Sequence, residues 1–172
     1  MPYTELIIAA GSEWETLVLD ARGHAPWSQA FGRRLNGHPE RIYWHHSVYP
    51  VAPLEPDEQL AWLVRTIPAG TYGWPYSFVV WPGPDASTIW YLNDVDEYHA
   101  HTYGHNDQVA ICGHGNYEAN EPPEHLVAAM WHLSGALQNM WGARLEVLPH
   151  RAVYATACPG VHLTAELEAL TG

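Results

Sequence analysis

A histidine and a cysteine that could bind a metal lie close together near the end of the chain. His150 and Cys158 are separated by seven residues, and Pro159 and Gly160 follow the cysteine directly. Imidazole nitrogen and thiolate sulfur are ligands that Zn²⁺ accepts in tetrahedral sites. Two ligands do not complete a site, so we expect a further ligand from elsewhere in the chain.

The third ligand is expected at the end of a β-strand. Ile42, Tyr43 and Trp44 favour β-structure, and His45 and His46 follow them. A ligand at the tip of a strand is held more rigidly than a ligand on a loop. Because neighbouring side chains of a strand point to opposite faces, only one of the two histidines should reach the metal.

Together, these motifs resemble the zinc-dependent N-acetylmuramoyl-L-alanine amidases of the phage-lysozyme and peptidoglycan-recognition-protein type. The resemblance covers residues 41–161, and the segments that carry it follow one another in the family's order. They are Trp44-His45-His46-Ser47, Ala100-His101-Thr102-Tyr103-Gly104-His105-Asn106, Gly115-Asn116-Tyr117, and His150 with Cys158-Pro159-Gly160. The resemblance implies Zn²⁺ bound by His45, His150 and Cys158. It also implies hydrolysis of the amide bond between N-acetylmuramic acid and the L-alanine of the stem peptide in bacterial peptidoglycan.

The resemblance assigns further roles beside the metal. Tyr76 falls where the family has a tyrosine that faces the zinc, and Thr156 falls where it has a threonine or a lysine near the metal. Both side chains could stabilise the oxyanion that develops during amide hydrolysis. Substrate contacts are expected from His46, His101 and Asn106.

The chain departs from the family pattern at several positions. Ser77 stands where members usually have histidine, and Ala152 stands where many have aspartate. A related branch has a catalytic glutamate in the strand that ends near Cys112, but residues 112–114 contain no carboxylate. This difference favours the mechanism that uses the tyrosine.

Other interpretations of the histidines and cysteines stay open. The chain could be a peptidoglycan-binding module without activity, as are some recognition proteins. It could instead hold a structural zinc ion, with Cys112 as a fourth ligand. A second metal site at His99, His101 and His105 is disfavoured, because no carboxylate or cysteine of known ligand geometry accompanies them.

Composition places the chain among globular proteins. With 172 residues and 47% hydrophobic content, it is long enough for a single domain with a sizeable core. A formal net charge of -12, with only 7 lysines and arginines, argues against binding to nucleic acid or to an anionic membrane surface. The 9 tryptophans and 10 tyrosines could stack on sugar rings, although most are expected in the core.

No secretion signal or membrane insertion is expected. The N-terminus lacks a basic start followed by an apolar run and a cleavage site, and no apolar run approaches the length of a membrane span. These features fit a phage or prophage endolysin that is made in the cytoplasm and acts on the host cell wall. We assume a monomer.

The elements that must position these residues predict an α/β (α+β) fold. We expect a central mixed sheet of about five to six strands, flanked by helices. Strands are predicted at 42–46, 75–81, 88–92, 108–112 and 144–148, and helices at 57–67 and 123–142.

Residues 1–40 precede the recognised part of the chain, and their role is not readable. Segments 6–10 and 16–19 could pair as strands. Alternatively, Ser12 and Glu15 could form a capping box that opens a helix ending near Gly23. A short helix is predicted at 27–35.

Overall fold

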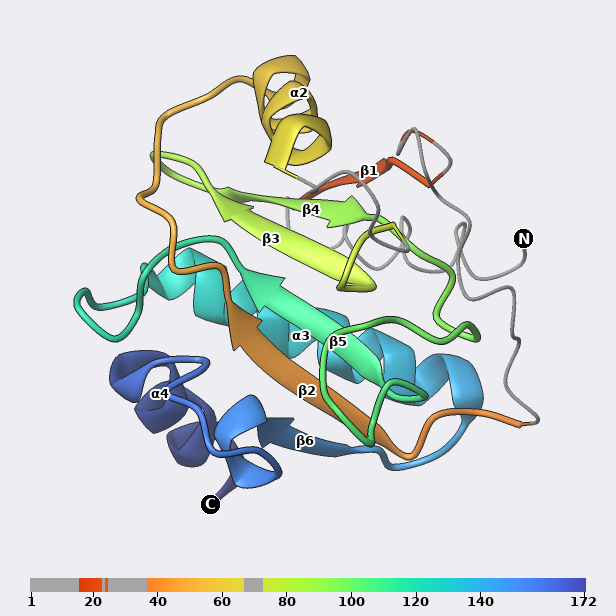
Figure 1. Cartoon of the computed structure of the whole chain (residues 1–172). Coiled ribbons are helices and arrows are strands. Elements are labelled where there is room, and N and C mark those ends of the chain that lie inside the picture. The colour runs from red at the N-terminus through yellow and green to blue at the C-terminus, as the bar shows by residue number, and fades with distance from the viewer. Residues whose placement is uncertain (1–15, 23, 25–36, 67–72) are drawn as a thin grey trace.

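Six strands form one mixed sheet in the computed structural model, which describes residues 16–22, 24, 37–66 and 73–172 (Figure 1). They are β1 (Leu17–Asp20), β2 (Arg41–His46), β3 (Phe78–Pro82), β4 (Ser87–Tyr91), β5 (Val109–Gly113) and β6 (Glu146–Pro149). Across the sheet the order is β1-β4-β3-β5-β2-β6. Only β3 and β4 pair antiparallel, and the other neighbours are parallel. The predicted α/β fold with a mixed sheet is therefore confirmed.

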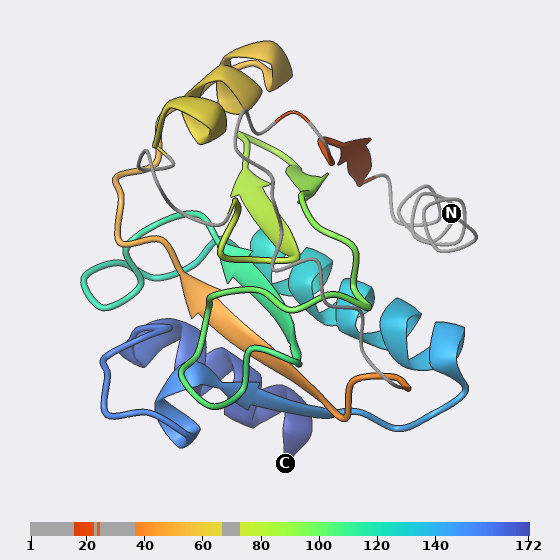
Figure 2. The same cartoon turned by 45° about the vertical axis from the view of Figure 1, so that its right-hand side comes forward.

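Helices pack on both faces of this sheet. They are α2 (Pro56–Thr66), α3 (Glu124–Trp141) and α4 (Val161–Thr171), with a short 3₁₀ helix η1 (His150–Ala152). On one face, Leu126 of α3 and Leu163 of α4 join the apolar side chains of the strands in one cluster. On the other face, Leu63 of α2 packs with tryptophans of β3 and β4. Figures 1 and 2 show α2 and α3 on opposite sides of the strands.

Strand β2 lies between β5 and β6 and sends its side chains to the two faces in turn. Ile42 and Trp44 point into the core beneath α3 and α4. The alternating residues Tyr43 and His45 therefore point to the opposite face. The indole N–H of Trp44 donates to the hydroxyl of Ser134 on α3, at 3.2 Å. A slip of one residue would place His45 in the apolar core, so burial fixes the register.

Helix α3 forms as the spacing of its apolar residues predicts. Leu126, Met130, Leu133 and Leu137 are all at most 2% exposed and recur on one face of the helix. Gly142 ends the helix in the left-handed conformation, with φ of 60°. Among the described residues, no helix has the length and the apolar character that crossing a membrane requires.

Some elements differ from the sequence predictions. The strand expected at 75–81 begins only at Phe78, and Tyr76 lies in the loop before it. Pro75 has no N–H to donate to a neighbouring strand, which keeps Pro75 itself out of the sheet. Helix α4 was not predicted, although Leu163 and Leu167 are buried at a spacing of four residues.

Near the N-terminus, the structure decides between the two interpretations of segment 16–19. The segment contains β1, which pairs in parallel with β4, so a strand at 16–19 is confirmed, whereas its expected pairing with 6–10 lies outside the described residues. The expected strand at 6–10, the capping box of Ser12 and Glu15, and the expected helix at 27–35 lie outside the described residues.

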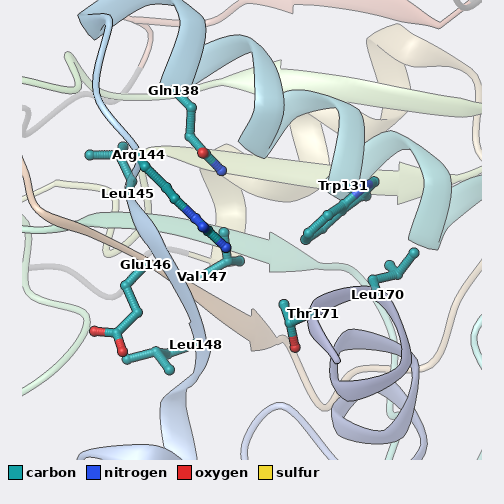
Figure 3. Close-up of a pocket in the computed structure, with 9 residues that line it drawn as sticks. All are labelled: Trp131, Gln138, Arg144, Leu145, Glu146, Val147, Leu148, Leu170 and Thr171. Atoms are coloured by element: carbon teal, nitrogen blue, oxygen red, sulfur yellow. The ribbon is translucent and has the colours of Figure 1, made fainter.

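A cavity of about 580 Å³ lies between α3, β6 and α4 (Figure 3). Trp131 and Gln138 reach toward it from α3, and Thr171 contributes from α4. None of the candidate metal ligands lines this cavity, so it is separate from the site described below.

A substitution at Gly160, just before α4, would test how closely the loop between η1 and α4 packs against the main chain at Tyr117. Its φ is 95°, and a Cβ atom there would lie 2.2 Å from the main-chain carbon of Tyr117. We expect Gly160→Ala to lower the free energy of unfolding by about 3 kcal/mol or more, because strain and overlap add. Urea denaturation measures the loss.

Gly142→Ala is the matched control for this substitution. Gly142 also has a positive φ, of 60°, but a Cβ atom there meets nothing within 4 Å. Its substitution should lower the free energy of unfolding by only about 1 to 2 kcal/mol. Equal losses for the two variants would show that the loop is not packed against the backbone at Tyr117.

Candidate metal centre

The pairing of β2 with β6 brings two histidines together. Trp44 on β2 is in register with Pro149 on β6. His45 is the next residue of β2, and His150 directly follows β6, so the two histidines meet at the same edge of the sheet. Their ring centroids lie 4.5 Å apart.

The loop after β6 returns Cys158 to the two imidazoles. The main-chain N–H of Arg151 donates to the carbonyl of Cys158 at 2.9 Å, which closes the loop between the predicted ligands. The main-chain N–H of His46 donates to the sulfur of Cys158 at 3.4 Å, and this bond ties the loop to β2. As a result, His45, His150 and Cys158 each offer a ligand atom within 4.8 Å of the others.

The unpaired nitrogens of His150 show that this group suits a metal ion. Both Nδ1 and Nε2 of His150 are buried and have no hydrogen-bond partner in the structure. Buried polar atoms are normally satisfied, so an unpaired imidazole beside a second imidazole and a thiol indicates a missing partner. Zinc accepts imidazole nitrogen and thiolate sulfur, and three protein ligands are the number found in catalytic zinc sites.

Burial keeps the two imidazoles neutral, as metal ligands must be. Burial lowers the pKa of His45 well below its usual value, and the neighbouring His101 and His150 lower it further. Burial also lowers the pKa of His150. In contrast, burial raises the pKa of the Cys158 thiol to about 11, although the N–H of His46 and the charge of Arg151 act against this. Without a metal the thiol therefore keeps its proton at neutral pH.

The two residues predicted to stabilise an oxyanion lie near this group. The ring of Tyr76 lies 5.2 Å from that of His45. Burial raises the pKa of the Tyr76 phenol well above its usual value, and the Cys112 and Cys158 thiols add to the shift. The phenol therefore stays protonated and can donate a hydrogen bond. The hydroxyl oxygen of Thr156 accepts from the main-chain N–H of Cys158 at 3.2 Å.

The residues predicted to contact substrate are more enclosed than the sequence suggested. His46 is 5% exposed, and its Nδ1 accepts from the main-chain N–H of Tyr117 at 3.2 Å. His101 is 8% exposed and contacts His45. The side-chain oxygen of Asn106 accepts from the main-chain N–H of Thr102 at 3.0 Å, which shapes the loop.

The remaining histidines of this loop do not converge on a second metal site. Nε2 of His99 lies 2.8 Å from the carbonyl oxygen of Asp94, and Nδ1 of His105 lies 3.4 Å from the hydroxyl of Tyr43. Across the described residues, His45, His150 and Cys158 form the single group suited to holding a metal.

Two neighbours of the site complete its description. Cys112 on β5 is in register with His45 and fully buried, but it does not belong to the metal-binding group. Tyr154, which the sequence analysis missed, stacks on His150 with ring centroids 5.8 Å apart and is 51% exposed. In the sequence, the position of Tyr154 four residues after His150 could have indicated that it lies near the ligand.

Solved structures with the same fold include peptidoglycan recognition proteins and an amidase. The chain aligns with Drosophila PGRP-LB at a TM-score of 0.74 and 22% identity, over 90% of this chain and 94% of that chain. It aligns with the endolysin N-acetylmuramoyl-L-alanine amidase LysCS from Clostridium intestinale URNW at a TM-score of 0.61 and 22% identity, over 89% of this chain and 95% of that chain.

A third similar structure is the ectodomain complex of the recognition proteins PGRP-LCa and PGRP-LCx bound to tracheal cytotoxin. The TM-score is 0.72 and the identity 20%, over 88% of this chain and 95% of that chain. No protein-family model and no curated protein sequence matches the chain. At these identities the similarity establishes the fold that the motifs implied.

Substitution of each cysteine separates a catalytic type of site from a closed structural one. Cys158→Ala should abolish stoichiometric zinc binding, because it removes the only thiol in the group. Cys112→Ala is the matched control and should still bind one zinc ion per chain. Metal analysis after dialysis measures both. Loss of zinc from the Cys112 variant would instead support a fourth protein ligand.

The pKa values predict how zinc binding depends on pH. At pH 6.5 the thiol of Cys158 is protonated, since its pKa is about 11, whereas burial lowers the pKa of His45 and of His150 and so favours their neutral forms. Zinc binding should therefore release about one proton and become tighter as the pH rises. Calorimetry in two buffers of different ionisation enthalpy measures this number. No release would exclude Cys158 as a ligand, and release of two or more would mean that a second group, an imidazole or a metal-bound water, also gives up a proton.

Proposed function

We propose that the protein is a zinc-dependent N-acetylmuramoyl-L-alanine amidase that hydrolyses the bond between N-acetylmuramic acid and L-alanine in bacterial peptidoglycan. The observation that carries this proposal is the unpaired imidazole of His150 beside His45 and Cys158. The similarity to LysCS, an endolysin of that activity, supports the choice of reaction. The motifs shared with the amidase family support the choice of bond.

The chain's own residues would act around the metal. A bound zinc ion would lower the pKa of a coordinated water toward neutrality and polarise the scissile carbonyl. Tyr76 stays protonated and can donate its O–H to the oxyanion that develops on the carbonyl. Thr156 uses its oxygen to accept from the N–H of Cys158, so its own hydrogen is free for a substrate oxygen.

The biological setting follows from the same proposal. A wall amidase of this kind would cut the peptidoglycan of a bacterial host, and we propose the role of a phage or prophage endolysin. Its partner would be peptidoglycan itself.

A non-catalytic peptidoglycan-binding module is the second candidate. The recognition proteins among the similar structures favour it, since the structure of PGRP-LCa with PGRP-LCx contains bound tracheal cytotoxin. The two candidates differ in whether the metal group supports turnover.

Digestion of purified peptidoglycan tests the proposal. The zinc-loaded protein should release stem peptides that begin with alanine and leave the glycan strands intact, as mass spectrometry of the products would show. Protein stripped with EDTA should release none, and restored zinc should recover the activity. Wall that sediments the protein but stays uncut would favour the binding module. Cleavage inside the stem peptide would keep the metal centre and change the scissile bond.

Tyr76→Phe provides a control within the same assay. It removes one hydrogen-bond donor and no metal ligand, so zinc content should stay at one per chain. We expect kcat to fall by about 100- to 1000-fold, as for other oxyanion donors. Unchanged kcat would remove Tyr76 from the mechanism.

A further inference from the structure

His101 lies directly behind the candidate ligand His45. The two rings meet edge to face, with centroids 5.3 Å apart and an interplanar angle of 88°. Nδ1 of His101 lies 3.3 Å from Nε2 of His45 and 2.9 Å from the hydroxyl of Thr102. Nε2 of His101 lies 3.0 Å from the carbonyl oxygen of Gln108. Protein atoms therefore contact both nitrogens of this buried ring.

These contacts indicate which nitrogen carries the proton in the rings of His101 and His45. A carbonyl oxygen can only accept, so Nε2 of His101 carries a proton and donates it to Gln108. In the neutral ring, Nδ1 is then an acceptor with one lone pair, which both Nε2 of His45 and the hydroxyl of Thr102 approach. Nε2 of His45 can form a hydrogen bond with this acceptor only if it carries the ring proton, and we assign the proton there. The lone pair of His45 is left on Nδ1, which lies 3.6 Å from the sulfur of Cys158.

We propose that His101 is a positioning residue that holds His45 in the tautomer with Nδ1 directed at the metal. The proposal rests on the zinc site of the proposed function. It gives His101 a role behind the ligand in place of the substrate contact expected from the sequence. The carbonyl of Gln108 holds His101 in place, because this carbonyl belongs to the main chain immediately before β5.

Metal-binding histidines generally donate their second ring N–H to a carboxylate, a carbonyl or water. Here a neutral imidazole stands between the ligand and the carbonyl. The carbonyl of Gln108 thus orients His101, and His101 in turn orients His45. This arrangement adds no negative charge near the metal.

The tautomer of His45 can be measured in the metal-free, full-length protein. Long-range ¹H–¹⁵N correlation spectra distinguish a protonated ring nitrogen from an unprotonated one, and the spectrum of His45→Ala assigns the signal. We expect the proton of His45 on Nε2. A proton on Nδ1, or an even mixture of tautomers, would overturn the proposal.

Two isosteric variants then test the consequence for the metal. In His101→Asn, the side-chain oxygen takes the place of Nδ1 and can still accept from His45. In His101→Gln, the amide takes the place of Nε2, so the bond to Gln108 remains while His45 loses its acceptor. We expect zinc affinity near that of the wild type for His101→Asn, and about 10- to 100-fold weaker binding for His101→Gln.

Competition with a chromogenic chelator measures these affinities, and thermal unfolding checks that each variant folds. Equal affinities for the wild type and both folded variants would overturn the proposal. If His101→Gln does not fold, the comparison of His101→Asn with the wild type and the tautomer of His45 decide. If the wild type binds no zinc, the proposed amidase fails, whereas the tautomer of His45 still decides the role of His101.

Discussion

Parallel pairing of β2 with β6 is the constraint on which the candidate site depends. The hydrogen bonds of this ladder set Trp44 opposite Pro149, and the following residues of the two strands are both histidines. Because the strands run in the same direction, both side chains emerge at the same edge of the sheet. The cysteine then needs only a short loop, closed by the bond from Arg151 to Cys158, to reach them.

Side chains along β2 alternate between the two faces of the sheet, so one face of the strand packs in the core and the other faces the candidate site. Trp44 anchors the strand to α3 through apolar contact and its bond to Ser134. His45, one residue later, emerges on the other face beside Tyr76. The same burial that fixes the register of Trp44 therefore fixes the position of His45. His101, His150 and Cys158 supply polar atoms to the environment of His45.

Periodicity and turn residues were sufficient to predict the long elements but not their partners. The buried stripe of α3, its end at Gly142 and the strand at β2 all followed from local patterns. Helix α4 follows Pro159 and Gly160, which on their own indicate an end rather than a beginning. The ligand set came from a resemblance, because no local pattern reveals which strands are neighbours. The place of His101 was hidden for the same reason: its contact with His45 joins residues 56 positions apart.

The position of β6 at the edge of the sheet would couple metal binding at the candidate site to local unfolding. Within the described chain β6 has four residues and pairs only with β2. Strands with a single partner open at a lower free energy than central ones. Since His150 directly follows β6, opening of this strand would withdraw one ligand from the other two. An ion that binds only the closed form would raise the free energy of opening by mass action. When the ion concentration exceeds its dissociation constant, this increase grows with the logarithm of the ratio of the two. A bound metal would then stabilise the pairing of β6 with β2 as well as take part in the chemistry.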